Sequence, residues 1–124
     1  MNVVDSSGWI EYLTEGEKAD FFVAPIQDVE HLIVPTICMY EVFKRLALDM
    51  GEEVALQVIG VMSYGKAVDL DRSIALDAAL ISLGRKLPMA DSIILATARA
   101  HEATLWTQDE HFKGFEGVRY IEKA

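Results

Sequence analysis

The stretch Asn2-Val3-Val4-Asp5-Ser6-Ser7 places an apolar run directly before an acidic residue and two hydroxyl residues. A short run of β-branched residues is typical of a buried strand. Either serine is suited to cap a helix that continues through Leu13. We therefore predict a strand over 2–5 that ends on Asp5 and leads at once into a helix.

Similar apolar runs alternate with helical patterns along the rest of the chain. Further strands are expected over His31–Pro35, Ala67–Leu70, Thr104–Thr107 and Val118–Ile121. Helices are expected over Glu15–Ile26, Thr36–Gly51, Glu52–Met62, Asp71–Gly84 and Met89–His101, with Asp71 as a cap and Pro25 as a weak point. Strands that alternate with helices or helix pairs predict an α/β fold in which about five strands form a mainly parallel sheet flanked by helices.

Length and composition are those of one globular domain over residues 1–124. The chain has 124 residues, of which 52% are hydrophobic and 25% charged, enough for a single core. No apolar stretch approaches the roughly 20 residues of a membrane span, and no secretory signal is visible at the amino terminus. Cys38 is the only cysteine, so we expect a buried thiol and a cytoplasmic protein without a membrane association.

Four acidic residues follow strand-like runs or open helical patterns. They are Asp5, Glu41, Asp91 and Asp109. In an open parallel sheet, residues just past the carboxyl ends of the strands meet in one crevice. Carboxylates gathered there without a cation would repel one another and partly protonate. A hard divalent metal such as Mg²⁺ or Mn²⁺, which prefers oxygen ligands, is therefore expected among them.

The net charge of −9 argues at first against a nucleic-acid partner, because Lys and Arg make the phosphate contacts. A divalent metal at the four acids would supply positive charge where a phosphate must sit, and local charge matters more for binding than the total. The acidity of the chain therefore does not exclude a phosphodiester substrate.

Three motifs and one helical glutamate resemble the PIN domain. The segments are Val3-Val4-Asp5-Ser6-Ser7, Glu41, Ala90-Asp91-Ser92-Ile93-Ile94-Leu95-Ala96-Thr97-Ala98 and Trp106-Thr107-Gln108-Asp109-Glu110-His111-Phe112. They span nearly the whole chain in the family's order and spacing. The length is similar to that of VapC-type toxins of toxin–antitoxin pairs.

The resemblance implies a metal-dependent endoribonuclease that hydrolyses RNA, such as tRNA or rRNA, with metal-activated water. It implies a catalytic set of Asp5, Glu41, Asp91 and Asp109. Within that set Asp5, Asp91 and Asp109 would hold Mg²⁺ or Mn²⁺, and Glu41 would act directly or through water. Ser6 and Thr107 match the family's hydroxyl positions, where they would orient a carboxylate, a water or a phosphate oxygen.

The same resemblance implies a cognate antitoxin and a homodimer as partners. Exposed apolar positions around Tyr40, Phe43 and 46–61 would serve one or the other. A housekeeping RNA-processing nuclease and a noncatalytic adaptor are alternatives. A response-regulator receiver domain fits poorly, because Asp5 stands alone after the first strand and only Lys123 follows the last one.

Several of these residues also have purely structural interpretations. Asp5 and Asp91 could be helix caps, Asp109 could close an Asx-turn, and Thr107 could be an ordinary strand residue. A single helical glutamate such as Glu41 is often a solvated surface group.

Other polar residues near these motifs are assigned no site role. We interpret His111 as a loop or surface residue, because an all-oxygen site does not need it. Asp69 is expected at the surface. Lys44 and Arg45 follow Glu41 by three and four residues, so one of them could face the same cleft, with a solvated helix face as the alternative.

Overall fold

The computed structural model describes residues 1–124 and contains one five-stranded sheet in which all pairings are parallel. Its strands are β1 (Asn2–Val4), β2 (Leu32–Pro35), β3 (Lys66–Val68), β4 (Thr104–Thr107) and β5 (Val118–Tyr120). The order across the sheet is β3-β2-β1-β4-β5. The predicted α/β fold with a parallel five-stranded sheet is therefore confirmed.

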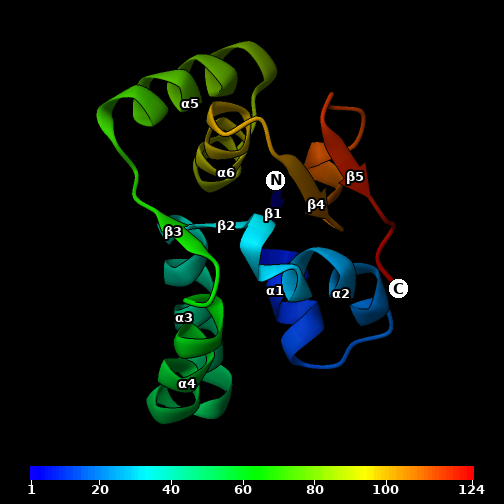
Figure 1. Cartoon of the computed structure of the whole chain (residues 1–124). Helices are drawn as coiled ribbons and strands as arrows, with labels where there is room; N and C mark the ends of the chain where they lie inside the picture. The colour runs from blue at the N-terminus through cyan, green and yellow to red at the C-terminus, as the bar shows by residue number, and fades with distance from the viewer.

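Six α-helices and two short 3₁₀ helices connect the strands. They are α1 (Ser6–Leu13), α2 (Ala19–Gln27), α3 (Thr36–Met50), α4 (Glu52–Met62), α5 (Arg72–Arg85) and α6 (Met89–Ala100), with η1 (Val29–His31) and η2 (Glu110–Phe112). Figure 1 shows α5 and α6 on one side of the strands and α1 to α4 on the other. The sheet is thus the middle layer of three.

The direction of winding reverses between β1 and β4. From β1 the chain moves outward through β2 to β3, and from β3 it crosses back through α5 and α6 to β4 on the other side of β1. The pairing of β1 with β4 aligns Val3 with Leu105 and Val4 with Trp106. In open α/β sheets, the carboxyl ends of the strands at such a reversal form the crevice in which ligands bind.

The hydrophobic core surrounds the central strand β1 and its neighbour β4. Val3, Val4 and Leu105 have no exposed surface, and the indole of Trp9 and the ring of Phe22 are equally buried beside them. Burying side chains of this size contributes roughly 1.5–3 kcal/mol each. This packing holds β1 and β4 rigidly, so the residues that follow them have fixed positions.

Gly8 allows α1 and α2 to approach each other closely. A Cβ atom at this position would lie 2.5 Å from the Phe22 ring and 2.7 Å from Cγ1 of Val4. Only glycine avoids both contacts without moving the core.

The helix predicted over 15–26 starts too early in the sequence. It begins only at Ala19, because residues before it form a turn in which the carboxylate of Glu11 accepts a hydrogen bond of 2.8 Å from the backbone N–H of Lys18. At the other end Pro25 lies inside the helix, which continues to Gln27. The missing N–H of a proline so close to a helix end costs only one hydrogen bond.

Two further predictions at element ends need correction. The cap of α1 is the Asp5 side chain, which accepts a hydrogen bond from the N–H of Gly8 at 2.9 Å, and neither serine fills this role. The third strand ends at Val68 and does not extend to Leu70. Asp71 caps α5 as predicted, through the N–H of Ile74 at 2.8 Å.

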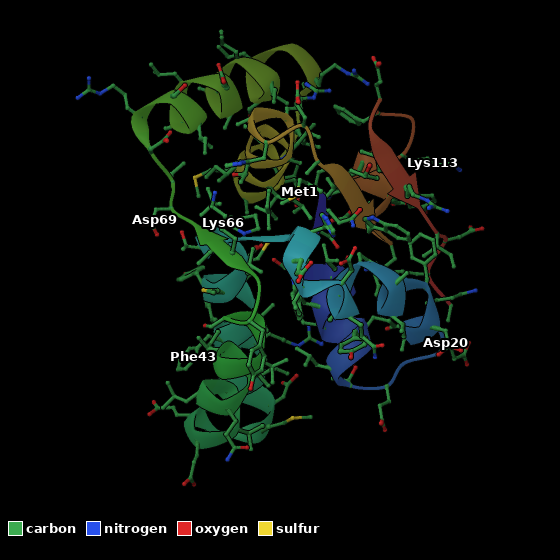
Figure 2. The ribbon with its side chains drawn as sticks, in the orientation of Figure 1. Met1, Asp20, Phe43, Lys66, Asp69 and Lys113 are labelled. Atoms are coloured by element: carbon green, nitrogen blue, oxygen red, sulfur yellow. The ribbon has the colours of Figure 1, made fainter.

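An apolar groove lies between α3 and α4, away from the carboxyl ends of β1 and β4. It is lined by Met39, Tyr40, Phe43, Lys44, Ala47, Leu48, Leu56 and Ile59. Figure 2 shows Phe43 on this helix pair, with Lys66 and Asp69 at the outer edge of the sheet. Of the apolar positions expected to be exposed, Tyr40, Leu48, Met50, Val54, Leu56 and Val61 lie at the surface. Phe43, Ala47, Val58 and Ile59 are half-buried, and Leu46 and Ala55 are buried in the core. No helix is long and apolar enough to cross a membrane.

Candidate functional site

Asp5 is the first residue after β1 and is buried at the winding reversal. Its Oδ2 accepts a hydrogen bond of 2.6 Å from the Thr107 hydroxyl, and its Oδ1 accepts the Gly8 N–H that begins α1. The Ser7 hydroxyl lies 2.9 Å from both carboxylate oxygens. Val4 of β1 pairs with Trp106 of β4. Asp5 and Thr107 are the next residues along the two chains, so they lie opposite each other. The carboxylate is therefore held at a fixed position and angle.

Burial disfavours the charged form of this carboxylate. Desolvation raises the pKa of Asp5 from 3.8 to about 7, although its hydrogen bonds from Thr107, Gly8 and Ser7 lower it, and the charge of Asp109 raises it further. No Lys or Arg side chain forms an ion pair with Asp5. The site thus holds a carboxylate whose ionisation a bound cation would favour.

Glu41 reaches the site from the second turn of α3. Its Oε1 accepts a hydrogen bond of 2.6 Å from the hydroxyl of Ser6, the first residue of α1. This contact links two helices that follow neighbouring strands, and it leaves the other carboxylate oxygen free of protein partners. The Ser6 hydroxyl therefore contacts a carboxylate of the cleft.

Asp91 lies in the first turn of α6, on the opposite layer. Burial, followed by the charge of Asp109, raises its pKa to about 6. Pro88 occupies the cap position of this helix, so Asp91 is not the helix cap considered from the sequence. Its carboxylate is free to take part in the site.

Asp109 and His111 complete the cluster from the segment after β4. The backbone N–H of Asp109 donates to the Thr107 hydroxyl at 2.9 Å, and its Oδ1 accepts the His111 N–H at 2.9 Å, which is the Asx-type turn considered from the sequence. The same turn brings Nδ1 of His111 to 3.1 Å from Oδ2 of Asp91 and 3.1 Å from Oδ1 of Asp109. His111 is exposed, as expected for a loop residue, but its ring faces the acids.

The four predicted acids line one open cleft of about 520 Å³. Its full lining is Asp5, Ser6, Ser7, Ile10, Glu11, Glu41, Arg45, Asp91, Ile94, Gln108, Asp109, Lys123 and Ala124. Five carboxylates thus face two cations, Arg45 and Lys123. Donor atoms of Asp91, Asp109 and His111 lie within 4.8 Å of one another. None of the four predicted acids forms an ion pair with a Lys or Arg side chain, and closely spaced carboxylate oxygens are donors that suit Mg²⁺ or Mn²⁺.

The structure also brings to the cleft residues that were assigned no site role from the sequence. Gln108 is buried, with its amide nitrogen near the Ser7 carbonyl at 3.4 Å and its Oε1 without a hydrogen-bond partner. Glu11 and Lys123 arrive from the end of α1 and from the segment after β5. Of the two basic residues considered on α3, Arg45 lines the cleft, while Lys44 lines the apolar groove.

Comparisons with known proteins agree with this fold. Residues 3–118 match the PIN domain family. A search of curated proteins found no match. A toxin–antitoxin complex from Klebsiella pneumoniae is similar with a TM-score of 0.81 and 22% identity over 96% of each chain.

Two further solved structures share the architecture at low identity. FitAcB from Neisseria gonorrhoeae has a TM-score of 0.75 and 20% identity, covering 98% of this chain and 97% of that one. Mycobacterium tuberculosis VapC20, described as a sarcin-ricin loop cleaving toxin, has a TM-score of 0.76 and 14% identity, covering 96% of this chain and 99% of that one. At these identities the similarity establishes a common fold.

Proposed function

Because this chain belongs to the PIN domain family, we propose that it is a metal-dependent endoribonuclease and the toxin of a toxin–antitoxin pair. The observation that carries the proposal is the convergence of Asp5, Glu41, Asp91 and Asp109 on one cleft at the winding reversal. We propose tRNA or rRNA as the substrate, since the similar VapC20 is described as cleaving the sarcin-ricin loop.

Asp5, Asp91 and Asp109 would hold the metal, Mg²⁺ or Mn²⁺. Such an ion lowers the pKa of a bound water and neutralises charge that develops on the phosphate. The protein's own contribution is positioning: Thr107 and the Gly8 N–H fix Asp5, and Ser6 fixes Glu41. The free oxygen of Glu41 would orient the attacking water.

The proposed reaction predicts the chemistry of the cut ends. Since water is the nucleophile and the RNA 2′-hydroxyl is not, the products should carry a 5′-phosphate and a 3′-hydroxyl. We would incubate purified protein with RNA and Mn²⁺, with an EDTA control, and map the termini. A 2′,3′-cyclic phosphate, or cleavage that survives EDTA, would overturn this mechanism.

The toxin role is tested in cells. Inducible expression of the wild type should arrest growth and produce discrete RNA ends, whereas Asp5→Asn should do neither. A small adjoining reading frame with a DNA-binding amino terminus would identify the antitoxin. If cells grow equally well with the wild type and with Asp5→Asn, while the purified wild type cleaves RNA in vitro, the second candidate is favoured. That candidate is a housekeeping RNA-processing nuclease.

The apolar groove between α3 and α4 is the surface we assign to the antitoxin. Tyr40, Leu48 and Leu56 are 59%, 83% and 63% exposed there, and contiguous exposed apolar surface marks an interaction site. The similar solved structures include toxin–antitoxin complexes. An antitoxin arginine could also pair with the uncompensated acids of the cleft. We also propose that the chain forms a homodimer.

Thr107→Val should weaken metal binding by about 10- to 100-fold, as expected when a partner that orients a ligand is lost. Valine keeps the volume but removes the 2.6 Å hydrogen bond to Asp5 and the acceptor of the Asp109 N–H. Titration of Mn²⁺ by calorimetry measures the change. Thr97→Val is the matched control, because its buried hydroxyl donates at 2.7 Å to a backbone carbonyl within α6. Equal Mn²⁺ affinities in the two variants would contradict a positioning role.

Arg45 and Lys123 should each supply one contact to substrate phosphate. Arg45 also pairs with Asp49 at 2.9 Å, but both side chains are about half exposed, and such pairs are weak. A plot of log kcat/KM against log salt concentration should have a negative slope. Substituting either cation by Gln should reduce the magnitude of this slope by about 0.7–1. Lys44→Gln, which removes a neighbouring charge outside the cleft, should leave the slope unchanged. Equal slopes in all three variants would exclude these contacts.

A further inference from the structure

His111 contributes a nitrogen atom to a cluster that otherwise offers only oxygen. Its Nδ1 lies 3.1 Å from a carboxylate oxygen of Asp91 and 3.1 Å from one of Asp109. All three donor atoms lie within 4.8 Å of one another. The residue comes from η2, which begins directly after Asp109, so the cluster joins the turn after β4 to the first turn of α6.

The two nitrogen–oxygen distances of 3.1 Å also match the distance between neighbouring ligands of one shared cation. Neighbouring ligands of an octahedral ion at about 2.1 Å lie roughly 3 Å apart. A neutral imidazole carries at most one proton on Nδ1, so it cannot donate fully to Asp91 and Asp109 at once. A metal ion between them would satisfy both carboxylates and the nitrogen lone pair.

The site is also accessible to an ion. The side chains of Asp91 and Asp109 are 16% and 26% exposed, and that of His111 is 56% exposed. Metal-bound histidines usually donate their second ring N–H to a carboxylate, a carbonyl or water. Nε2 of His111 has no partner in the protein, and the exposure of the ring lets water take this role.

We propose that His111 is a ligand of the metal held by Asp91 and Asp109, and that it makes the site prefer Mn²⁺ to Mg²⁺. Mg²⁺ is a hard ion that favours oxygen ligands, whereas imidazole nitrogen favours transition metals. The inference rests on the proposed metal-dependent function but concerns which metal the site selects. It adds to the acidic cluster a nitrogen ligand from the Asp109-Glu110-His111 turn.

The test compares His111→Ala with His31→Ala. His31 is the matched control, because it forms a similar exposed pair with Asp28 at 2.9 Å and does not line the cleft. His111→Ala should weaken Mn²⁺ binding by about tenfold or more and change Mg²⁺ binding by less than about threefold. Pulsed electron paramagnetic resonance of bound Mn²⁺ should detect a coordinated ¹⁴N nucleus in the wild type and in His31→Ala only.

Each alternative result has a distinct meaning. A parallel loss of Mn²⁺ and Mg²⁺ affinity without a nitrogen coupling in the wild type would show that His111 only orients the carboxylates, and the proposal would be overturned. Mn²⁺ affinity that His111→Ala leaves unchanged would also overturn it. A nitrogen coupling in a protein that cuts no RNA would support the ligand role and refute the proposed ribonuclease function instead.

Discussion

Asp5→Asn is expected to reduce RNA cleavage by at least about a thousandfold, comparable to or greater than the loss of one preorganised charge-stabilising donor in other enzymes. The substitution keeps the size of the side chain but removes the charge of the most buried carboxylate in the cleft. An amide is a poor ligand for a hard divalent ion compared with a carboxylate. Mn²⁺ affinity should therefore fall together with the cleavage rate.

The same substitution is expected to stabilise the metal-free protein at pH 8. The asparagine oxygen can still accept the Gly8 N–H that caps α1, and no ionised group is buried. In the wild type, desolvation raises the pKa of Asp5 to about 7, which means that folding at pH 8 carries the cost of burying its charge. Loss of activity with gain of stability is the signature of a residue kept for function.

Cleavage kinetics and thermal unfolding in EDTA measure the two effects. Asp69→Asn is the control, because it removes one carboxylate at the outer edge of the sheet (Figure 2) and should alter neither quantity substantially. A variant that is both inactive and less stable at pH 8 would assign Asp5 a mainly structural role. Activity within tenfold of the wild type would exclude it as a metal ligand.

The positions of Asp5, Thr107 and Asp109 could be predicted from sequence because strand periodicity controls them. A short apolar strand that ends at a polar residue fixes where that residue emerges, and two parallel neighbours in register bring their ends together. Asp5 and Thr107 consequently meet at 2.6 Å, although 102 residues separate them. Local sequence patterns were sufficient to predict these residues because the pairing of the strands fixes where each of them lies.

Residues that reach the cleft by turn geometry or side-chain length could not be predicted in the same way. His111 faces Asp91 only because the backbone turns back through η2. Lys123 lines the cleft only because the segment after β5 passes beside it. Neither a single histidine nor a single lysine carries a periodic pattern, so tertiary structure was required to place them.

The late start of α2 has a comparable cause. The apolar residues of that segment do follow helical spacing, but the Glu11 carboxylate captures the backbone N–H of Lys18 at 2.8 Å. Glu15 in the same turn has a φ of 53°, a left-handed conformation that interrupts a helix. A side chain from the preceding helix therefore overrides local propensity.

Metal-free protein is expected to become more stable as the pH falls from 8 to about 6. The pKa values of Asp5 and Asp91 are raised by burial to about 7 and about 6, from 3.8 in the unfolded chain. The folded state therefore binds more protons than the unfolded state between these limits, and the free energy of unfolding falls as pH rises through this window. At about 1.4 kcal/mol for each pKa unit, the change between pH 8 and pH 6 amounts to about 2 kcal/mol.

Bound metal should reverse this trend. Mn²⁺ binds the ionised carboxylates, so its affinity and its contribution to stability increase with pH. Thermal unfolding at pH 6, 7 and 8, in EDTA and in saturating Mn²⁺, should give midpoints that fall with pH in the first series. The gap between the two series should be widest at pH 8. Stability in EDTA that rises from pH 6 to pH 8 would contradict the raised pKa values.

Asp5→Asn separates the contribution of this carboxylate from that of other groups that titrate in the same range. Histidine is the residue type whose protonation most often changes near neutral pH, and the chain has three histidines, His31, His101 and His111. Because the variant keeps all three histidines and loses only the Asp5 carboxylate, its stability in EDTA should vary less with pH than that of the wild type. If the two profiles run parallel, Asp5 ionises in the folded protein as easily as in the unfolded chain. The cleft would then have no buried charge for a metal to relieve.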